Sequence, residues 1–401
     1  MTPTGTLVEA SMDQHSPGVA KSWKRLDGVD LLRGLAIFFV LMNHVNMRLI
    51  FNVGTYAPAW PKPLLGALVW NGQFGVQMFF AISGFLITGT SLRRWRTLDG
   101  VSVRDFYLMR FARIAPLLLA LLAVLSVLHW LQWNNFVVNQ RTGGLGRAIL
   151  AALTFHVNVL EARRGYLPAN WDILWSLSVE EMFYLFFPIV CWFLGRTKLI
   201  YVLLCVFVVF GPFARTVLSH GNEVWQEYSY LGGMDAIALG CLTALLVANV
   251  SFSRRALRWF ATIGVVLAGF ILGFAHFRFL FPLGATGLEE TILAIGTCCI
   301  VAWAAQSQWR SPIALGWLRS LGQRSYEIYL THMFVVFALL SFFLRIEKPS
   351  WFVPVYFLLT VAFAGALGAL VARSYSEPMN RWLRNRFGDG PERLGSALET
   401  R

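Results

Sequence analysis

Two ionisable residues, Arg33 and His44, lie in the first long apolar segment of the chain. Their spacing of eleven residues, at 100° each, returns a helix to within about 20° of its starting direction, so both lie on one face, about 16 Å apart along the axis. Such groups are costly inside a membrane unless they are paired or hydrated. Because histidine takes up a proton near neutral pH, the pair predicts general base chemistry at His44. Arg33 alone is more typical of a side chain that reaches the lipid headgroups, and His44 could instead hydrogen-bond a neighbouring helix.

Two carboxylates, Glu180 and Glu181, stand at the start of a later apolar run, between Trp175 and Tyr184. They could orient a histidine, bind sugar hydroxyls or assist proton transfer. They could equally stabilise a helix N-terminus, for which Ser178 would be an acceptable cap. We predict a functional role for Glu180, whereas Glu181 fits the structural role as well.

A second histidine, His332, ends the sequence that begins at Ser325 and contains Tyr326 and Tyr329. The three-residue spacing of the two tyrosines and the histidine places them along one flank of a helix. His332 could meet His44 only if the two helices pack together. Taken alone, His332 is more typical of a packing residue than of a catalytic one.

Arg110 and Arg113 are three residues apart, so they occupy adjacent positions on one helix face. Arginine forks suit phosphate groups, which indicates an anionic ligand. A cluster of positive charge at the cytoplasmic end of membrane spans explains Arg93, Arg94 and Arg96 equally well, but it explains the spaced pair less well.

The elements that must position these residues are membrane spans. The chain has 401 residues, of which 57% are hydrophobic and 14% charged, whereas about 25% of residues are charged in soluble domains. Apolar runs near the length of about 20 residues needed to cross a bilayer recur along the chain. We therefore predict an all-α, polytopic transmembrane helix bundle of about ten spans, at residues 31–51, 68–91, 114–133, 178–194, 198–218, 230–250, 259–280, 288–306, 325–346 and 352–373.

The run at residues 148–160 is an eleventh candidate, but it is short and contains His156 and Asn158. Ten spans place most basic side chains on the cytoplasmic side, whereas eleven place most of them outside, against the positive-inside rule. We therefore predict that residues 148–160 are partly embedded or interfacial and that both termini are cytoplasmic.

The predicted organisation is a cytoplasmic tail of residues 1–25, a membrane domain of residues 26–386 and a cytoplasmic tail of residues 387–401. The first tail has no apolar stretch that could serve as a cleaved signal peptide.

The net charge of +13 arises mostly in segments between spans, which favours membrane topology over nucleic-acid binding. The five cysteines lie inside apolar runs without metal-ligand or redox spacing, so no metal site is predicted.

Seven motifs occur in a distinctive order along the chain. They are Asp30 to Arg33 followed by His44, Phe79 to Leu86, Arg110 to Pro116, Trp175 to Tyr184, Asp235 to Gly240, Ser325 to His332, and Glu377 with Pro378. In order and spacing they resemble the acyltransferase-3 family of membrane O-acyltransferases, which modify extracytoplasmic polysaccharides, lipopolysaccharide and some small molecules. The resemblance extends from about Leu26 to Arg386.

The resemblance implies a reaction in which cytoplasmic acyl-CoA, usually acetyl-CoA, gives its acyl group to a hydroxyl of an extracytoplasmic carbohydrate or glycolipid. Acyl-CoA would be a co-substrate, and no bound cofactor is expected. The protein would lie in a bacterial plasma (inner) membrane, among lipids, with polysaccharide-assembly proteins as further partners. No fused extracytoplasmic transferase domain is predicted, so the acyl group would reach the acceptor directly or through a separate protein.

The resemblance also implies site residues. His44, Arg33 and Glu180 match the catalytic positions, with His44 acting either as a base or as a relay through a covalent intermediate. Met182 stands where many members have a polar residue, and Gly233 precedes Met234 and Asp235 where an arginine is common. The predicted substrate-binding residues are Arg110, Arg113, Asp30, Trp175, Ser325, Tyr326, Tyr329 and His332.

Two other classes of protein remain open at this point. A transporter or proton-coupled carrier would also use intramembrane Arg, His and Glu residues, although no inverted repeat is evident. A scaffold for polysaccharide assembly would need no base at His44.

Overall fold

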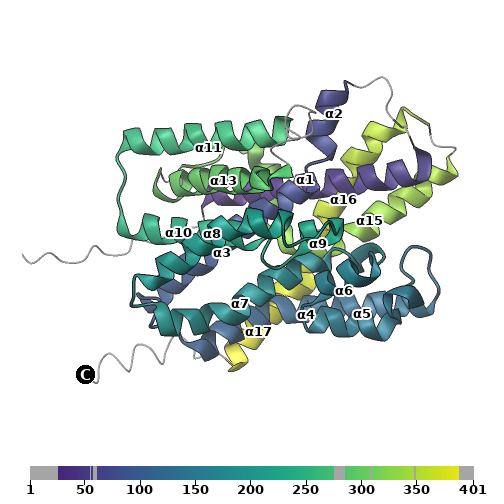
Figure 1. Ribbon diagram of the computed structural model, residues 1–401. Helices are drawn as coiled ribbons and strands as arrows, with labels where there is room; N and C mark the ends of the chain where they lie inside the picture. The colour runs from purple at the N-terminus through teal and green to yellow at the C-terminus, as the bar shows by residue number, and fades with distance from the viewer. Residues whose placement is uncertain are drawn as a thin grey trace, which may run out of the picture.

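The computed structural model describes residues 26–54, 56, 61–274, 285–307, 309–346 and 349–387, and these residues form helices without any strand (Figure 1). The α-helices are α1 Asp27–Val53, α2 Lys62–Val69, α3 Gly72–Trp95, α4 Val103–Trp130, α5 Gly144–Leu153, α6 Val157–Arg164, α7 Leu174–Leu194, α8 Leu199–Thr216, α9 Glu223–Tyr228, α10 Met234–Asn249, α11 Arg254–Phe274, α13 Leu288–Ser307, α14 Gly316–Gln323, α15 Ser325–Arg345, α16 Phe352–Val371 and α17 Glu377–Phe387. Short 3₁₀ turns are η1 Gln140–Thr142, η2 Ala169–Trp171 and η4 Ile313–Leu315, and η5 Ala372–Ser376 is a π-helical segment.

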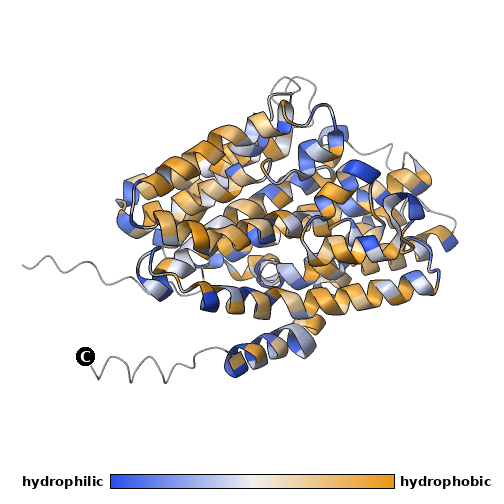
Figure 2. Ribbon diagram, turned by 60° about the horizontal axis from the view of Figure 1, so that its bottom comes forward, coloured by the Kyte–Doolittle hydropathy of each residue, from blue (hydrophilic) through white to orange (hydrophobic). Residues whose placement is uncertain are grey.

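Nine helical segments of the described chain are long and apolar enough to cross a membrane. Hydrophobic residues cover most of the length of the long helices (Figure 2). The prediction of an all-α, polytopic helix bundle is confirmed. The span predicted at residues 230–250 corresponds to α10, which is shorter than predicted, with 16 residues and a length of about 24 Å. The chain before α10 is taken up by α9 and a turn, and α10 itself is largely buried between α3, α8 and α13.

The segment at residues 148–160 does not form one helix. It divides between α5 and α6, which are separated by a break at Thr154 to His156, where Phe155 has a φ of 55°. Neither helix is long enough to span a bilayer, since α5 has ten residues and α6 has eight. Together with η1 and α9 they form a layer of short helices at one end of the bundle, in which α6 contacts α5, η1 and α9 (Figure 1).

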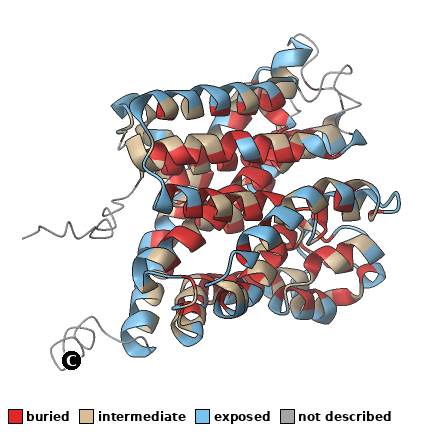
Figure 3. Ribbon diagram, turned by 60° about the vertical axis from the view of Figure 1, so that its left-hand side comes forward, coloured by how far each residue is buried: buried red, intermediate tan, exposed pale blue. Residues whose placement is uncertain are grey.

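Close helix contacts hold the centre of the bundle together, where buried residues concentrate (Figure 3). Gly84 on α3 lies against the carbonyl of Ile237 on α10, and Gly240 on α10 lies against the carbonyl of Ala81. A side chain at either glycine would collide with the facing backbone. Small residues let the backbones of two membrane helices approach closely. Within a membrane, helices associate through such packing rather than through the hydrophobic effect.

A buried ion cluster fastens α8, α10 and α13 to one another. Arg215 is 1% exposed, and its Nη2 lies 2.8 Å from Oδ2 of Asp235, while its Nε lies 2.7 Å from Oε2 of Glu290. Its guanidinium also donates to the backbone oxygen of Gly287 at 2.7 Å. Asp235, which belongs to one of the ordered motifs, therefore has a structural role in this fold.

Some predicted regions lie outside the described residues. These are the N-terminal tail at 1–25, nearly all of the predicted C-terminal tail at 387–401, and the end of the span predicted at 259–280.

Candidate functional site

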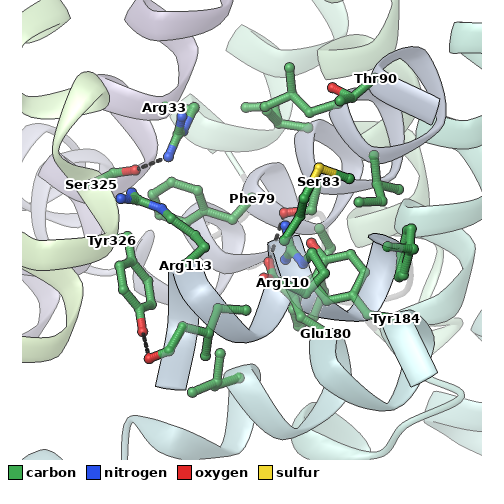
Figure 4. A pocket seen from close by; sticks show the side chains of 18 of the residues that line it. Arg33, Phe79, Ser83, Thr90, Arg110, Arg113, Glu180, Tyr184, Ser325 and Tyr326 are labelled. Atoms are coloured by element: carbon green, nitrogen blue, oxygen red, sulfur yellow. Dashed lines mark hydrogen bonds between the residues drawn. The ribbon is translucent and has the colours of Figure 1, made fainter. Parts of the chain in front are cut away.

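A cavity of about 660 Å³ lies between α1, α3, α4, α7, α15 and α17 (Figure 4). This volume is in the range of small-molecule sites in proteins. Among the described residues that line the cavity, six are arginines and Glu180 is the one carboxylate. The arginines are Arg33, Arg93, Arg94, Arg110, Arg113 and Arg384. This excess of positive charge fits an anionic ligand.

Helix α4 contributes Arg110 and Arg113 to the same wall of the cavity, as their spacing predicts. The helix begins at Val103, where the hydroxyl of Ser102 accepts a hydrogen bond from the backbone N–H of Asp105 at 3.3 Å. With this cap the helix begins more than two turns before residue 114, where the predicted span begins. As a result, both arginines lie inside a helix and hold a fixed orientation.

The guanidinium of Arg110 lies over the ring of Tyr184, 3.6 Å from its centroid. Its Nη2 is 3.9 Å from Oε1 of Glu181, which is a loose ion pair. The cation–π contact keeps the guanidinium in place without neutralising its charge. Arg110 can therefore still bind an anion.

Glu180 faces the cavity from α7 and accepts a hydrogen bond of 2.9 Å from the hydroxyl of Ser83 on α3 (Figure 4). The structural alternative for this carboxylate is wrong, because α7 begins at Leu174, well before Glu180. Ser178 is not a helix cap, since its hydroxyl donates back to the carbonyl of Leu174 at 3.0 Å. Glu180 thus lies within the helix and points at the site.

Arg33 enters the cavity from α1 and donates to the hydroxyl of Ser325 on α15 at 2.8 Å (Figure 4). Arg113 forms an ion pair of 2.9 Å with Glu327, which lies behind the cavity wall and is 1% exposed. Arg33 has no ion pair among the described residues, so its charge is available to a ligand.

Two tyrosines of α15 complete the polar lining. The hydroxyl of Tyr326 donates to the carbonyl of Ile114 at 2.9 Å. The Tyr329 hydroxyl lies 2.7 Å from Oγ of Ser176 and donates to the carbonyl of Ile173 at 2.9 Å. These bonds hold both aromatic rings rigidly against the inner part of the cavity.

His44 and His332 do not line the cavity, but they contact each other beyond its inner end. Nε2 of His332 lies 3.4 Å from Nδ1 of His44, and the ring centroids are 4.9 Å apart. The ring of Tyr329, which does line the cavity, is 5.9 Å from the His332 ring. The packing of α1 against α15 therefore brings the two predicted histidines together.

Asp30 and Trp175 also lie outside the cavity. Asp30 accepts a hydrogen bond of 3.1 Å from Gln323, which joins α1 to α14. Trp175 is buried and stacks on Tyr228, with ring centroids 4.0 Å apart. The side chains of both residues therefore make contacts within the helix bundle and do not reach the cavity.

The prediction did not include several lining residues. Asn380 and Arg384 come from α17, which continues from α16 through the π-helical segment η5 and packs against α4. Their signal was present as an amphipathic, arginine-rich stretch after the last apolar run. Ser83 and Ser176 lie within two of the ordered motifs, Phe79 to Leu86 and Trp175 to Tyr184, but only packing shows where their hydroxyls point.

The layer of short helices carries a second polar cluster. Glu161 is fully buried beside Asp172 and accepts a hydrogen bond of 2.9 Å from the N–H of Leu167. Burial raises the pKa of Glu161 well above its usual range, and Asp172 raises it further. The described residues contain no group of three or more His, Cys, Asp or Glu side chains suited to a metal ion.

Comparisons with known proteins agree with this architecture. A family model described as an acyltransferase domain matches residues 26–369. The peptidoglycan O-acetyltransferase OatA of Listeria monocytogenes is 26% identical over 354 residues, which are 82% of this chain and 52% of the relative. The O-acetyltransferase OatA of Staphylococcus aureus is 24% identical over 366 residues, or 84% of this chain and 55% of the relative.

The chain spans about half the length of these curated relatives. No solved structure matches it. The family model nevertheless covers the helices that build the arginine-lined cavity, apart from α17. This integral membrane protein therefore belongs to the acyltransferase-3 family.

Proposed function

We propose that the protein transfers an acetyl group from acetyl-CoA to a hydroxyl of an extracytoplasmic carbohydrate. The observation that supports this proposal most directly is the cavity with six arginines and a single carboxylate among its described lining residues. The phosphates of CoA carry several negative charges, and arginine binds phosphate oxygens in a bidentate manner. The names of the relatives, both O-acetyltransferases, support acetyl as the acyl group.

In this proposal the cavity opens to the cytoplasm, and the protein lies in a bacterial plasma membrane. The excess of basic residues at this end of the spans supports that orientation through the positive-inside rule. Exposed Arg93, Arg94 and Arg384 at the mouth would bind the nucleotide phosphates of the donor. Arg33 and Arg110 lie deeper, where they would bind the pyrophosphate and the pantetheine arm.

The thioester end of the donor would then reach the inner part of the cavity, beside Tyr329. The acceptor hydroxyl approaches from the opposite side and attacks the thioester carbonyl carbon, so that a C–O bond forms and the C–S bond breaks. His44 takes the hydroxyl proton and returns it to the departing thiolate. The role of Glu180 is to keep its negative charge near Arg110 and the reacting end of the donor.

Donor dependence tests this function against that of a carrier. The purified protein, reconstituted in liposomes, is incubated with radiolabelled acetyl-CoA and cell-wall glycan, and the label in the glycan is measured. Peptidoglycan is the first acceptor to test, because the Listeria relative is named for it. We expect label in the glycan in the presence of the protein and none with His44→Ala. Equal labelling with His44→Ala, or solute movement without use of acetyl-CoA, would contradict the proposal.

The donor site has its own test. Arg110→Ala should raise the KM for acetyl-CoA about 10-fold, since a charge-assisted hydrogen bond contributes about 1.5–3 kcal/mol. Arg196→Ala is the matched control, because Arg196 pairs with Asp99 on the surface and does not line the cavity. Equal KM values for acetyl-CoA in the two variants would show that Arg110 does not bind the donor.

A further inference from the structure

The contacts of His332 determine which of its ring nitrogens carries the proton. Its Nδ1 lies 2.7 Å from the carbonyl oxygen of Tyr329 and 3.3 Å from that of Ile328. A carbonyl oxygen can only accept a hydrogen bond, so Nδ1 must be the donor. In a neutral imidazole the other nitrogen then has a free lone pair. Nε2 of His332 is therefore an acceptor.

The same argument applies to His44. Its Nδ1 lies 2.8 Å from the carbonyl oxygen of Val40, which can only accept. The second neighbour of this nitrogen is Nε2 of His332, at 3.4 Å, which is an acceptor by the preceding argument. Two acceptors on two different helices thus face one nitrogen. The proton of neutral His44 belongs on Nδ1, and Nε2 keeps its lone pair.

We propose that His332 is a positioning residue that, together with the carbonyl of Val40, fixes the tautomer and the orientation of His44, so that Nε2 of His44 is the atom that takes the proton from the acceptor hydroxyl. This inference rests on the proposed function. The histidine of a serine protease depends on a comparable arrangement, in which an acceptor at Nδ1 leaves Nε2 as the base. Here the acceptor is a neutral imidazole.

The reaction step accounts for each proton. Nε2 of His44 gains the hydroxyl proton while Nδ1 keeps its own, which makes an imidazolium. Its Nδ1–H continues to donate to Val40 and to Nε2 of His332, and both acceptors stabilise the new charge. When the thiolate leaves, Nε2 gives up the added proton to sulfur. His332 itself neither gains nor loses a proton.

The surroundings of His332 support a positioning role. The residue is fully buried on α15. Its neighbour Tyr329 is held by Ser176 and by the carbonyl of Ile173, so the helical turn that orients His332 has little freedom. A histidine that served only to fill space would not need a second histidine at its Nε2.

Nitrogen NMR of the protein labelled with ¹⁵N-histidine tests the tautomer without any substrate. His44→Gln identifies the signals of His44 by their loss. We expect His44 of the wild-type protein to carry its proton on Nδ1, with Nε2 unprotonated. We expect His332→Leu to raise the fraction of His44 that is protonated on Nε2, because the carbonyl of Val40 then remains as the one acceptor at Nδ1 among the described residues. A wild-type His44 protonated on Nε2, or a tautomer unchanged by His332→Leu, would overturn the proposal.

Kinetics of acetyl transfer provides the second readout. His332→Leu should lower kcat about 10²-fold, which is at the low end of general base contributions, and should change the KM for acetyl-CoA by less than about twofold. His332→Gln places an amide oxygen near the position of Nε2 and should recover part of kcat. Equal kcat in the two variants, or a loss confined to KM, would contradict the proposal.

The two readouts separate this inference from the proposed function. The NMR result depends only on the folded protein and holds whether or not acetyl-CoA is the donor. The predicted tautomer with no acetyl transfer by the wild-type protein would count against the proposed function alone. The matched control is His156→Leu, because His156 contacts Thr154 in the break between α5 and α6 and should leave both readouts unchanged.

Discussion

Arg113 on α4 and Glu327 on α15 form an ion pair in which Nη1 and Oε1 are 2.9 Å apart. Ser376 of η5 donates a second hydrogen bond, of 2.8 Å, to the same carboxylate oxygen. One buried carboxylate therefore ties the arginine wall of the cavity to the segment that leads into α17. The two arginines of α4 therefore differ in role, because Arg113 partly stabilises the fold whereas Arg110 remains available to a ligand.

We expect Arg113→Ala to destabilise the protein, because it leaves the charge of Glu327 buried without its partner. Loss of one member of a buried pair costs about 3–5 kcal/mol, and we expect roughly half of that here because Arg113 is partly exposed. Thermal unfolding in detergent measures the effect. Adding Glu327→Gln should restore part of the lost stability, and a double variant less stable than Arg113→Ala would contradict this account.

The bond between Ser83 and Glu180 predicts a kinetic effect. Ser83→Ala removes the hydroxyl that donates to the carboxylate. We expect a stability loss of about 1 kcal/mol and a fall in kcat of about 10-fold as the carboxylate loses its orientation. Ser83→Thr keeps a hydroxyl and should retain more activity than the alanine variant. Equal rates for the two variants would show that the hydrogen bond has no part in the reaction.

Arg384 should act only on the nucleotide part of the donor. It is exposed on α17 at the mouth of the cavity, so Arg384→Glu should raise the KM for acetyl-CoA. The same variant should hardly change the KM for S-acetylpantetheine, which lacks phosphates, because charge acts here through phosphate contacts. Initial rates with both donors test this, and parallel changes in the two KM values would refute it.

The buried carboxylate of Glu161 predicts a pH-dependent stability. Its pKa is raised well above the ordinary 4.5, so folded Glu161 keeps a proton that the unfolded chain releases as the pH rises above that value. Its contribution to stability is present at low pH and is lost on the way up to the folded pKa.

Glu161→Gln keeps an oxygen for the N–H of Leu167 and has no proton to lose. The Tm of Glu161→Gln minus that of the wild-type protein should therefore be larger at about pH 8 than at about pH 5. Unfolding scans of both proteins at the two pH values measure this difference. The same Tm difference at both pH values would show that Glu161 is ionised in the folded protein.

Local spacing predicted part of the site. Because Arg110 and Arg113 are three residues apart on one helix, their common wall follows from helix geometry alone. The apolar runs likewise revealed most of the spans. The short length of α10 did not follow from hydropathy, since the residues before it are apolar enough to resemble part of a span.

Other parts of the site depend on tertiary packing. The contact between His44 and His332 requires α1 and α15 to be neighbours, and no spacing within either helix determines that. The spacing of Arg33 and His44 placed both on one helix face, but it did not show that Arg33 lines the cavity whereas His44 does not. Arg384 reaches the cavity because α17 packs against α4, and no spacing within α17 determines that contact.

The packing of Tyr329, His44 and His332 against one another at the inner end of the cavity has a consequence for the permeability of the membrane. The cavity lining reaches Tyr329 and Leu330, and the next turn of α15 brings His332, which is fully buried. A water-filled path through the bundle would let protons flow down their gradient at every opening. Under the proposed function, burial at this depth would let the protein bind its charged donor from one side while the cell keeps its membrane potential.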